Sequence, residues 1–201
     1  MGVCLKPSEE VYPAKMNATK LAIVSEPRST PGLVEVFTGN GKGKTTAALG
    51  IAIRALGHAL KVHIVFFMKG EFPYGEQKIL AQLQGLSYER FGSLDFVDPC
   101  HIKEEEKLQA RQALEAARKA LAIGLFDVVI LDEVLVASAW GLVEVDDVVS
   151  LVRGKPEMVD LVLTGRYADP RLVELADMVT EMKEIKHPYK KGQLSRQGID
   201  F

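Results

Sequence analysis

The stretch VFTGNGKGKTT, residues 36–46, places three glycines and two lysines between an apolar run and a segment with helical spacing. Its Gly43-Lys44-Thr45 sequence is the ending of a phosphate-binding loop. Thr38 stands at the first position of the motif, where the usual pattern has glycine. The stretch therefore predicts a phosphate-binding loop with an unusual first residue.

The residue types in this loop match what phosphate binding requires. The glycines allow a tight turn that points several N–H groups at one anion, and the following helix adds its positive N-terminal end. Lys44 adds a mobile positive charge for the phosphates, and the hydroxyl of Thr45 is a ligand for Mg²⁺. The alternative is a glycine-rich turn with solvated lysines. The position between a strand and a helix favours phosphate binding.

Composition indicates a single domain without an obvious polymeric partner. The 201 residues, 47% hydrophobic and 26% charged, are enough for one core that buries about 70% of the unfolded surface. With 25 Lys and Arg against 27 Asp and Glu, the net charge of -2 favours neither a nucleic acid nor a membrane as partner. Cys4 and Cys100 form no disulfide framework. The chain has no membrane-length apolar run and no apolar block at its start, so we expect a cytoplasmic protein.

The chain divides into an arm and one domain. Residues 1–31 contain four prolines and one short apolar run, so we expect a mobile N-terminal arm outside the core. From 32 to 201 strand patterns alternate with helix patterns, and the clearest helices are 43–57 and 102–123. The strand patterns lie at 33–38, 61–68, 87–91, 127–131, 160–164 and 178–182. This alternation predicts an α/β fold, a single P-loop NTPase-like domain whose mostly parallel sheet carries helices on both faces.

A second chemical signal is the segment DVVILDE, residues 127–133, where a buried strand ends in Asp132 and Glu133. Paired acids at the carboxyl end of a parallel strand suit Mg²⁺ held directly or through water, with one acid left to orient a partner. Acids at strand ends also cap neighbouring helices, which is the alternative. Beside a phosphate-binding loop, the metal interpretation is favoured.

Two basic residues lie near predicted ligand-binding positions. Arg54 lies about three turns into the first helix, where it either reaches a nucleotide or is solvated. Lys69 follows the second strand, at the edge where α/β sheets bind ligands, although any strand exit has this position. The sequence contains no Ser-His-Asp or Cys-His nucleophile motif and no kinase-type His-Arg-Asp loop. An enzyme with this sequence would therefore take its nucleophile from the substrate.

Four segments carry a resemblance to a known family: VFTGNGKGKTTAALGIAIRALGH, ILDE, LTGR and KHPYKKGQLSRQGIDF. Through them the chain resembles the ATP:corrinoid adenosyltransferases, and the match runs from Leu33 to Phe201. The resemblance implies transfer of the 5′-deoxyadenosyl group of ATP to Co(I) of a corrinoid, with Mg²⁺ as cofactor and release of tripolyphosphate. It also implies a cytoplasmic homodimer and a flavoprotein or another reductant that supplies Co(I).

The resemblance assigns roles to individual residues. In this family the nucleotide is held in reverse, with C5′ rather than the γ-phosphate facing the attacking atom, so we infer that Thr38 need not be glycine. The resemblance implies that Lys44 and Glu133 are catalytic, and that Thr45, Asp132 and Glu133 support Mg²⁺. The implied nucleotide-binding residues are Gly39, Asn40, Gly41, Lys42, Gly43, Lys44, Thr45, Thr46 and Arg54.

Two segments depart from the family pattern. Better-known members have a Gly-Phe-Thr-Trp segment whose aromatic rings press on the lower face of the corrinoid, whereas this chain has GSLDFV at 92–97. Phe96 is the aromatic candidate for corrinoid binding that this segment retains. The proline-containing arm also differs from the helical N-terminal segment that closes over the corrinoid in some relatives. None of the four histidines lies in an Asp-x-His-x-x-Gly run, which supports a corrinoid without an axial ligand from the protein.

Two other functions fit a phosphate-binding loop. An ATPase or kinase of the phosphate-loop class would use water or a hydroxyl as acceptor and release ADP. A noncatalytic nucleotide-binding regulator would bind Mg·ATP without turnover and use the KHPY segment, residues 186–189, as a partner surface. Analysis of the products distinguishes the three functions.

Overall fold

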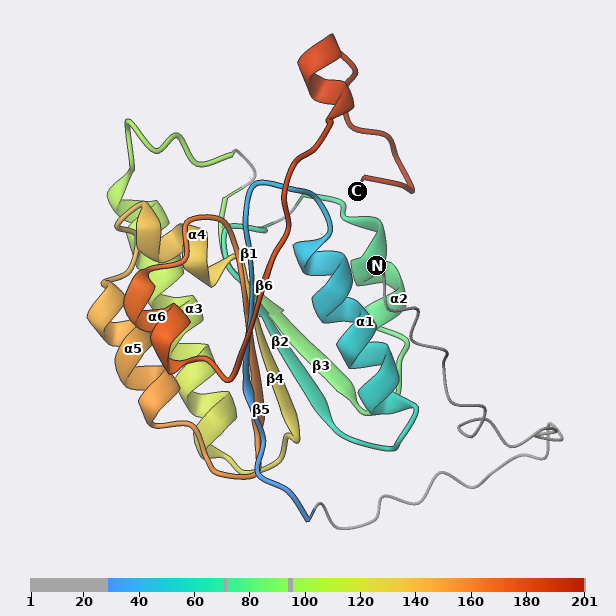
Figure 1. The fold of residues 1–201 in the computed structure, drawn as a ribbon, viewed down its shortest axis with the longest axis vertical. Coiled ribbons are helices and arrows are strands. Elements are labelled where there is room, and N and C mark those ends of the chain that lie inside the picture. The colour runs from blue at the N-terminus through green and yellow to red at the C-terminus, as the bar shows by residue number, and fades with distance from the viewer. Residues whose placement is uncertain (1–28, 71, 94–95, 201) are drawn as a thin grey trace, which may run out of the picture.

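Six short strands form one sheet at the centre of the structure (Figure 1). The computed structural model describes residues 29–70, 72–93 and 96–200. The strands are β1 (Val34–Thr38), β2 (Val62–Phe66), β3 (Leu86–Arg90), β4 (Val128–Asp132), β5 (Asp160–Thr164) and β6 (Met178–Glu181). Their order is β3-β2-β4-β5-β1-β6, and each neighbouring pair is parallel. The predicted α/β fold is confirmed, with a sheet that is parallel throughout its described pairs.

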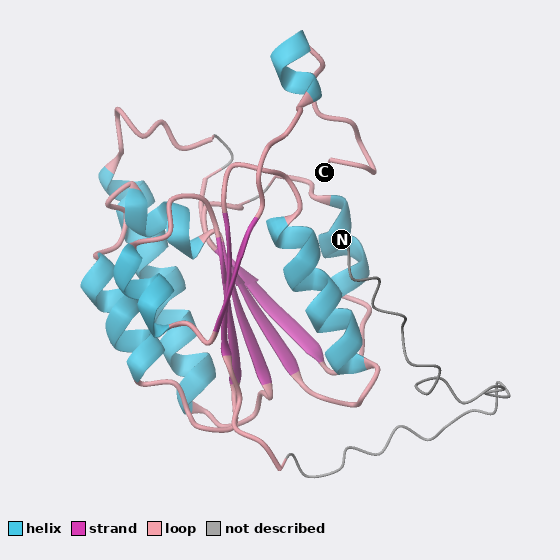
Figure 2. Ribbon diagram, in the orientation of Figure 1, coloured by secondary structure: helices cyan, strands magenta, loops and turns pink. Residues whose placement is uncertain are grey.

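Helices cover both faces of this sheet, as Figure 2 shows. They are α1 (Lys44–Leu56), α2 (Gly75–Leu80), α3 (Glu104–Ala122), α4 (Val134–Ala139), α5 (Val145–Arg153) and α6 (Pro170–Leu175). A 3-10 turn at Pro188–Lys191 lies beyond the end of the sheet and covers neither face. α1 and α2 lie on one face, and α3 to α6 lie on the other. The predictions for 43–57 and 102–123 are confirmed as α1 and α3. The helices α2, α4 and α6, each six residues long, are too short to show a clear period in the sequence. The nine-residue α5 does have an apolar face, made by Val148, Val149, Leu151 and Val152, but the sequence analysis did not single it out.

The central strand β4 shows why the chain folds into layers. Val129 and Leu131 pack into the core under α3 to α6, whereas Val128 and Ile130 pack into the core under α1 and α2. All four side chains are at most 2% exposed. Successive residues of a strand point to opposite faces, so a strand covered on both sides must be apolar throughout. This requirement explains the unbroken apolar run of β4.

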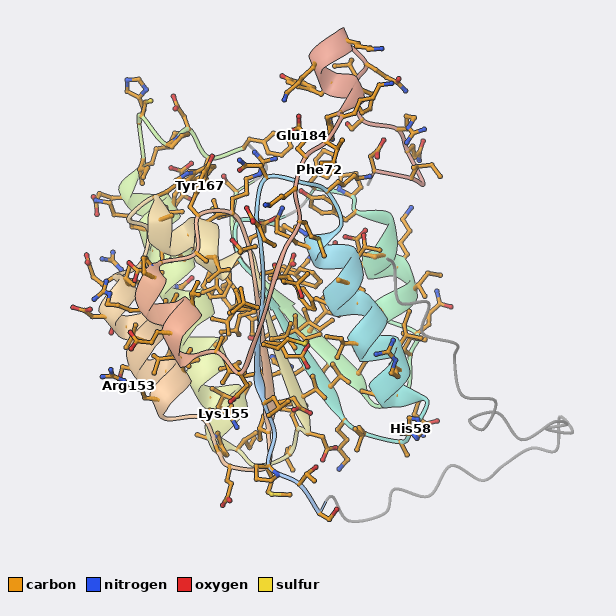
Figure 3. All side chains as sticks on the ribbon, viewed as in Figure 1. His58, Phe72, Arg153, Lys155, Tyr167 and Glu184 are labelled. Carbon is orange, nitrogen blue, oxygen red and sulfur yellow. The ribbon has the colours of Figure 1, made fainter. Side chains whose placement is uncertain are left out.

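The parallel arrangement gathers the loops that carry polar residues at one edge of the sheet. The phosphate loop follows β1, Lys69 lies just beyond β2, Glu133 follows β4 and Arg166 follows β5. The carboxyl ends of parallel strands share one edge, so segments far apart in sequence meet there. In Figure 3, the labelled Tyr167 lies at this edge, toward the same end of the molecule as the C-terminal segment.

Most of the predicted N-terminal arm, residues 1–28, lies outside the described residues. Where the described chain joins the body, the N–H of Gly32 donates to the carbonyl of Glu157 at 2.8 Å. The N–H of Leu33 donates to the carboxylate of Asp160 at 2.7 Å. These bonds attach the start of the predicted domain to the segment around β5. The division of the chain at residue 31 stays a prediction.

Gly165, in the LTGR segment after β5, allows α4 to approach the end of the sheet. Its φ is +142°, a backbone conformation that residues other than glycine rarely adopt. A Cβ at this position would lie 2.8 Å from the Cβ of Leu135 and 2.8 Å from the backbone nitrogen of Val136. Neither atom can move without shifting α4, so glycine is required here by packing.

We expect Gly165→Ala to lower the free energy of unfolding by about 2 kcal/mol or more, because backbone strain adds to overpacking. Gly50→Ala is the matched control, since Gly50 lies inside α1 and a Cβ there would meet no atom within 4 Å. That change should raise the free energy of unfolding by about 0.5–1 kcal/mol through helix propensity. Denaturant unfolding measures both values, and a Gly165→Ala variant as stable as the parent would contradict the packing argument.

Candidate active site

The phosphate loop packs directly on the chain that leaves β6. The N–H of Gly41 donates to the carbonyl of Met182 at 2.6 Å. A Cβ on Gly39 would lie 2.4 Å from that same carbonyl oxygen, and a Cβ on Gly41 would lie 2.7 Å from it. These two glycines are therefore needed for close approach of two backbones, in addition to the turn that phosphate binding requires.

The structure shows a further use for the threonine that replaces the first glycine of the motif. Thr38 is the last residue of β1, and its carbonyl accepts the N–H of Met182 at 2.8 Å. Its hydroxyl accepts the N–H of Ala168 at 3.4 Å, so the side chain connects the loop after β5 to the end of β1. Glycine could not make this connection.

Lys44 begins α1 and is 6% exposed. Its ammonium donates to the carbonyl of Gly39 at 2.8 Å and to that of Gly41 at 2.7 Å, which holds it inside the loop. Burial lowers the pKa of Lys44, and the nearby Glu133 carboxylate partly opposes that shift. The loop thus holds a positive charge in a fixed position at its centre, whereas the sequence analysis expected a mobile one.

The two acids that end β4 occupy different environments. Asp132 is 1% exposed, and its Oδ1 accepts the Thr164 hydroxyl at 2.7 Å while its Oδ2 accepts the Lys69 ammonium at 2.6 Å. Glu133 lines the cavity beside the loop and has a φ of 65°, which is unusual for a residue other than glycine. Its N–H donates to the Thr164 hydroxyl at 3.0 Å. Burial and the neighbouring Asp132 raise the pKa of Glu133.

Lys69 connects the acids to the loop. Its ammonium lies 3.3 Å from the hydroxyl of Thr45 and within 5.1 Å of the Tyr74 ring centre. Burial opposes the charged form, but Asp132, Glu133 and Tyr74 together outweigh it, so the pKa of Lys69 is raised. Its place just beyond β2 was visible in the sequence, but its partner was not.

A cavity of about 750 Å³ joins these groups, which is within the range of small-molecule sites. Its floor is the phosphate loop with Thr45, and Lys69, Glu133 and Arg166 line its side. The C-terminal segment forms much of the remaining wall, with residues from 187 to 200. The predicted residues Asn40, Gly41, Lys42, Gly43, Lys44, Thr45, Thr46 and Glu133 all line this cavity.

The C-terminal segment turns back over the loop, as Figure 1 shows for the red end of the chain. Lys42 forms an ion pair with Asp200, and its ammonium donates to the carbonyl of Ile199 at 3.2 Å. Asp200 also accepts from the side chain of Arg196 at 3.0 Å. Arg196 and Lys42 hold the pKa of Asp200 well below its usual range. A contact across 158 positions of sequence could not be predicted from local patterns.

The oxygen atoms that meet at the cavity suit a hard cation. The Thr45 hydroxyl and the Glu133 carboxylate both line it, and Mg²⁺ prefers one or two carboxylates together with phosphate oxygens. Within the part of the chain that the structure describes, no group of three His, Cys, Asp or Glu residues is arranged for a metal ion. The donor set therefore fits Mg²⁺ held together with a nucleotide. Direct ligation by Asp132 stays a prediction.

Four predicted ligand residues do not line this cavity: Gly39 and Asp132, described above, and Arg54 and Phe96. Arg54 is exposed in the last turn of α1, about 15 Å along the helix axis from Lys44. Phe96 is 81% exposed, and its ring centre lies 6.0 Å from that of Phe72. Phe72 in turn lies 4.8 Å from Tyr74, which lines the cavity. These three rings, the aromatic group, extend from the cavity toward solvent, and only Phe96 was singled out from the sequence.

A parallel sheet whose first strand leads through a glycine-rich, lysine-bearing loop into a helix defines the phosphate-loop class of nucleotide-binding proteins. Within that class, the chain belongs to the family described as ATP:corrinoid adenosyltransferase BtuR/CobO/CobP, whose sequence model matches residues 30–201. The resemblance found in the sequence is thereby confirmed.

Individual relatives match over nearly the whole chain. The chain is 34% identical to the corrinoid adenosyltransferase of Escherichia coli K12 over 197 residues, which are 96% of this chain and 100% of the relative. It is 35% identical to the corrinoid adenosyltransferase of Pseudomonas aeruginosa, covering 89% of this chain and 88% of the relative. The chain is 32% identical to the corrinoid adenosyltransferase CobA of Salmonella typhimurium, and the match covers 96% of this chain and 100% of the relative.

None of the helices that the structure describes combines the length and the hydrophobicity that a bilayer crossing requires.

Replacing Asp200 with alanine should release the C-terminal segment from the loop, because Lys42 and Arg196 lose their shared carboxylate. We expect trypsin to cut the segment several-fold faster at its basic residues, since proteolysis follows the population of the open form. Asp147→Ala is the control, because it removes an exposed ion pair with Arg118 elsewhere. Equal cleavage rates in the two variants would show that the Lys42–Asp200 pair does not hold the segment.

Proposed function

We propose that this chain transfers the 5′-deoxyadenosyl group of ATP to Co(I) of a corrinoid and releases tripolyphosphate. The observation that carries the proposal is the continuity between the phosphate-loop cavity and the aromatic group of Phe72, Tyr74 and Phe96. A triphosphate bound at the loop would leave its nucleoside end free to approach these rings. Flat apolar rings are suitable neighbours for a corrinoid macrocycle. Family membership supports the same reaction.

The reaction needs little covalent chemistry from the protein. Co(I) of the corrinoid substrate attacks C5′, a Co–C bond forms, and the C5′–O bond breaks with its electron pair leaving on tripolyphosphate. The protein must align the two reactants and stabilise the negative charge that gathers on the leaving group. Lys44, held inside the loop, and Lys42, after leaving Asp200, provide positive charge at that position.

Thr45 and Glu133 would hold Mg²⁺ at the triphosphate. When bound, Mg²⁺ supplies a hard cation that neutralises phosphate charge. The pKa of Glu133 is raised because the acid is buried with Asp132 beside it. A nearby cation would favour the charged carboxylate and oppose this shift. We further propose a homodimer in the cytoplasm that receives electrons for cobalt from a flavoprotein or another reductant. No observation favours an ATPase, a kinase or a noncatalytic regulator.

Anaerobic incubation with ATP, Mg²⁺ and a chemically reduced corrinoid tests the proposal. We expect a light-sensitive Co–C product and intact tripolyphosphate in equal amounts, formed only when cobalt is Co(I). Optical spectra follow the corrinoid, and ion-exchange chromatography follows the phosphate product. Steady release of ADP and phosphate without a corrinoid would overturn the proposal in favour of an ATPase.

Glu133→Gln should reduce the Mg²⁺-dependent rate by about 10²-fold or more while leaving the fold intact, because the amide keeps the shape but loses the charge. The midpoint of the Mg²⁺ titration should move to higher concentration, and circular dichroism should report an unchanged fold. Glu144→Gln, which changes the exposed acid before α5, serves as the control. An unchanged rate and Mg²⁺ midpoint in Glu133→Gln would remove Glu133 from the metal site.

Phe96→Ala tests the corrinoid end of the site. A ring that shields the lower face of the corrinoid favours four-coordinate cobalt, so its loss should slow turnover of cob(II)alamin with a reductase far more than turnover of preformed Co(I). Ile53→Ala is the control, because it removes an exposed apolar side chain on α1 away from the cavity. Equal effects of Phe96→Ala in the two assays would exclude the shielding role.

A further inference from the structure

Lys69 is held in position from several directions. It is 9% exposed, and its ammonium lies 2.6 Å from Oδ2 of Asp132 and 3.3 Å from the hydroxyl of Thr45. The ring centres of Tyr74 and Phe66 lie 5.1 Å and 5.4 Å from the same ammonium, within the range of cation–π contact. A carboxylate, a hydroxyl and two aromatic faces therefore surround one positive charge at the base of the phosphate loop.

The backbone around Lys69 is equally constrained. Met68 has a φ of 54°, an uncommon conformation for a residue that is not glycine. The N–H of Lys69 donates to the carbonyl of Phe91 at 3.0 Å. A Cβ on Gly70 would lie 2.2 Å from the carbonyl oxygen of Gly92, so the two chains are in backbone contact. This packing fixes the backbone from which the Lys69 side chain extends.

The hydrogen bonds of Asp132 disfavour it as a metal ligand. Both of its oxygens accept hydrogen bonds, one from Lys69 and one from Thr164, and the carboxylate is 1% exposed. A metal ion at Asp132 would have to displace the ammonium and leave it buried without its partner, which is strongly unfavourable. Glu133, by contrast, lines the cavity. The ammonium of Lys69 lies next to the Thr45 hydroxyl, where a cation is expected in a phosphate-loop site.

We propose that Lys69 is a built-in cation of the nucleotide site, a positioning residue that keeps Asp132 from ligating metal and adds fixed positive charge beneath the triphosphate. ATP then binds without a divalent metal, and Mg²⁺ enters through Thr45 and Glu133 to serve the transfer step. This inference rests on the proposed function for the identity of the nucleotide. Its test measures nucleotide and metal binding, so it fails or succeeds independently of adenosyl transfer.

The first experiment compares ATP binding by calorimetry in EDTA. We expect the wild-type chain to bind metal-free ATP, and Lys69→Met to lose affinity by about tenfold or more, because one nearby charge is removed. Lys61→Met is the control, since it removes an exposed lysine that lies just before β2, at the end of the strand opposite Lys69. Wild-type affinity in Lys69→Met, or no metal-free binding by the wild type, would overturn the proposal.

The second experiment titrates Mn²⁺ alone, without nucleotide, and follows it by electron paramagnetic resonance. Lys69→Met should gain a bound Mn²⁺ that the wild type lacks, because Asp132 and Glu133 then form an uncompensated pair. The double variant Lys69→Met/Asp132→Asn removes both buried charges, so it preserves the fold if the single variant does not. It should keep the loss of metal-free ATP binding but show no Mn²⁺ gain. A wild-type Mn²⁺ signal that disappears in Asp132→Asn would show that Asp132 is a metal ligand and refute the proposal.

Discussion

Burying a carboxylate is costly unless hydrogen bonds and an opposite charge compensate it, and Asp132 satisfies both conditions at the end of β4. Thr164 of β5 donates to one oxygen, and Lys69 beyond β2 donates to the other. These two contacts connect the ends of three neighbouring strands. Losing Lys69 would leave the Asp132 charge buried without its counter-charge, and losing Thr164 would leave one oxygen without its hydrogen bond, so both contacts favour this one arrangement of the strand ends. Glu133 and the Thr45 hydroxyl take their positions from that arrangement.

A second constraint acts where the phosphate loop meets the chain that leaves β6, because the two backbones lie too close together for a side chain to fit between them. Gly39 and Gly41 of the phosphate loop touch the chain leaving β6 at Met182. Because β6 pairs with β1 in parallel, the loop and the exit of β6 leave the sheet together. The C-terminal segment that follows is thereby directed over the cavity, where Asp200 reaches Lys42. The pairing of β1 with β6 thus determines both what the phosphate loop packs against and what forms part of the cavity wall.

The parts of the fold that could be predicted from sequence are those with strong local signals. The apolar run of β4 predicts a strand buried on both faces, and the Gly-rich loop before α1 predicts a helix N-terminus that binds an anion. The short helices α2, α4 and α6 lack such signals, since six residues hold too few turns to show a period. Of the aromatic group, only Phe96 was accessible to sequence reasoning. Phe72 and Tyr74 join it through the folding of the segment after β2.

The sequence by itself determined the parallel α/β class and membership of the family, and it predicted a phosphate-binding loop with Lys44 and Thr45, because each rests on short local patterns. The tertiary structure alone decided that Asp132 faces Lys69 while Glu133 lines the cavity, and that Lys42 meets a carboxylate 158 positions away. The physical reason is that local patterns specify which residues are apolar, whereas the partner of each polar group depends on which strand ends become neighbours. In a parallel sheet, that outcome is set by strand order.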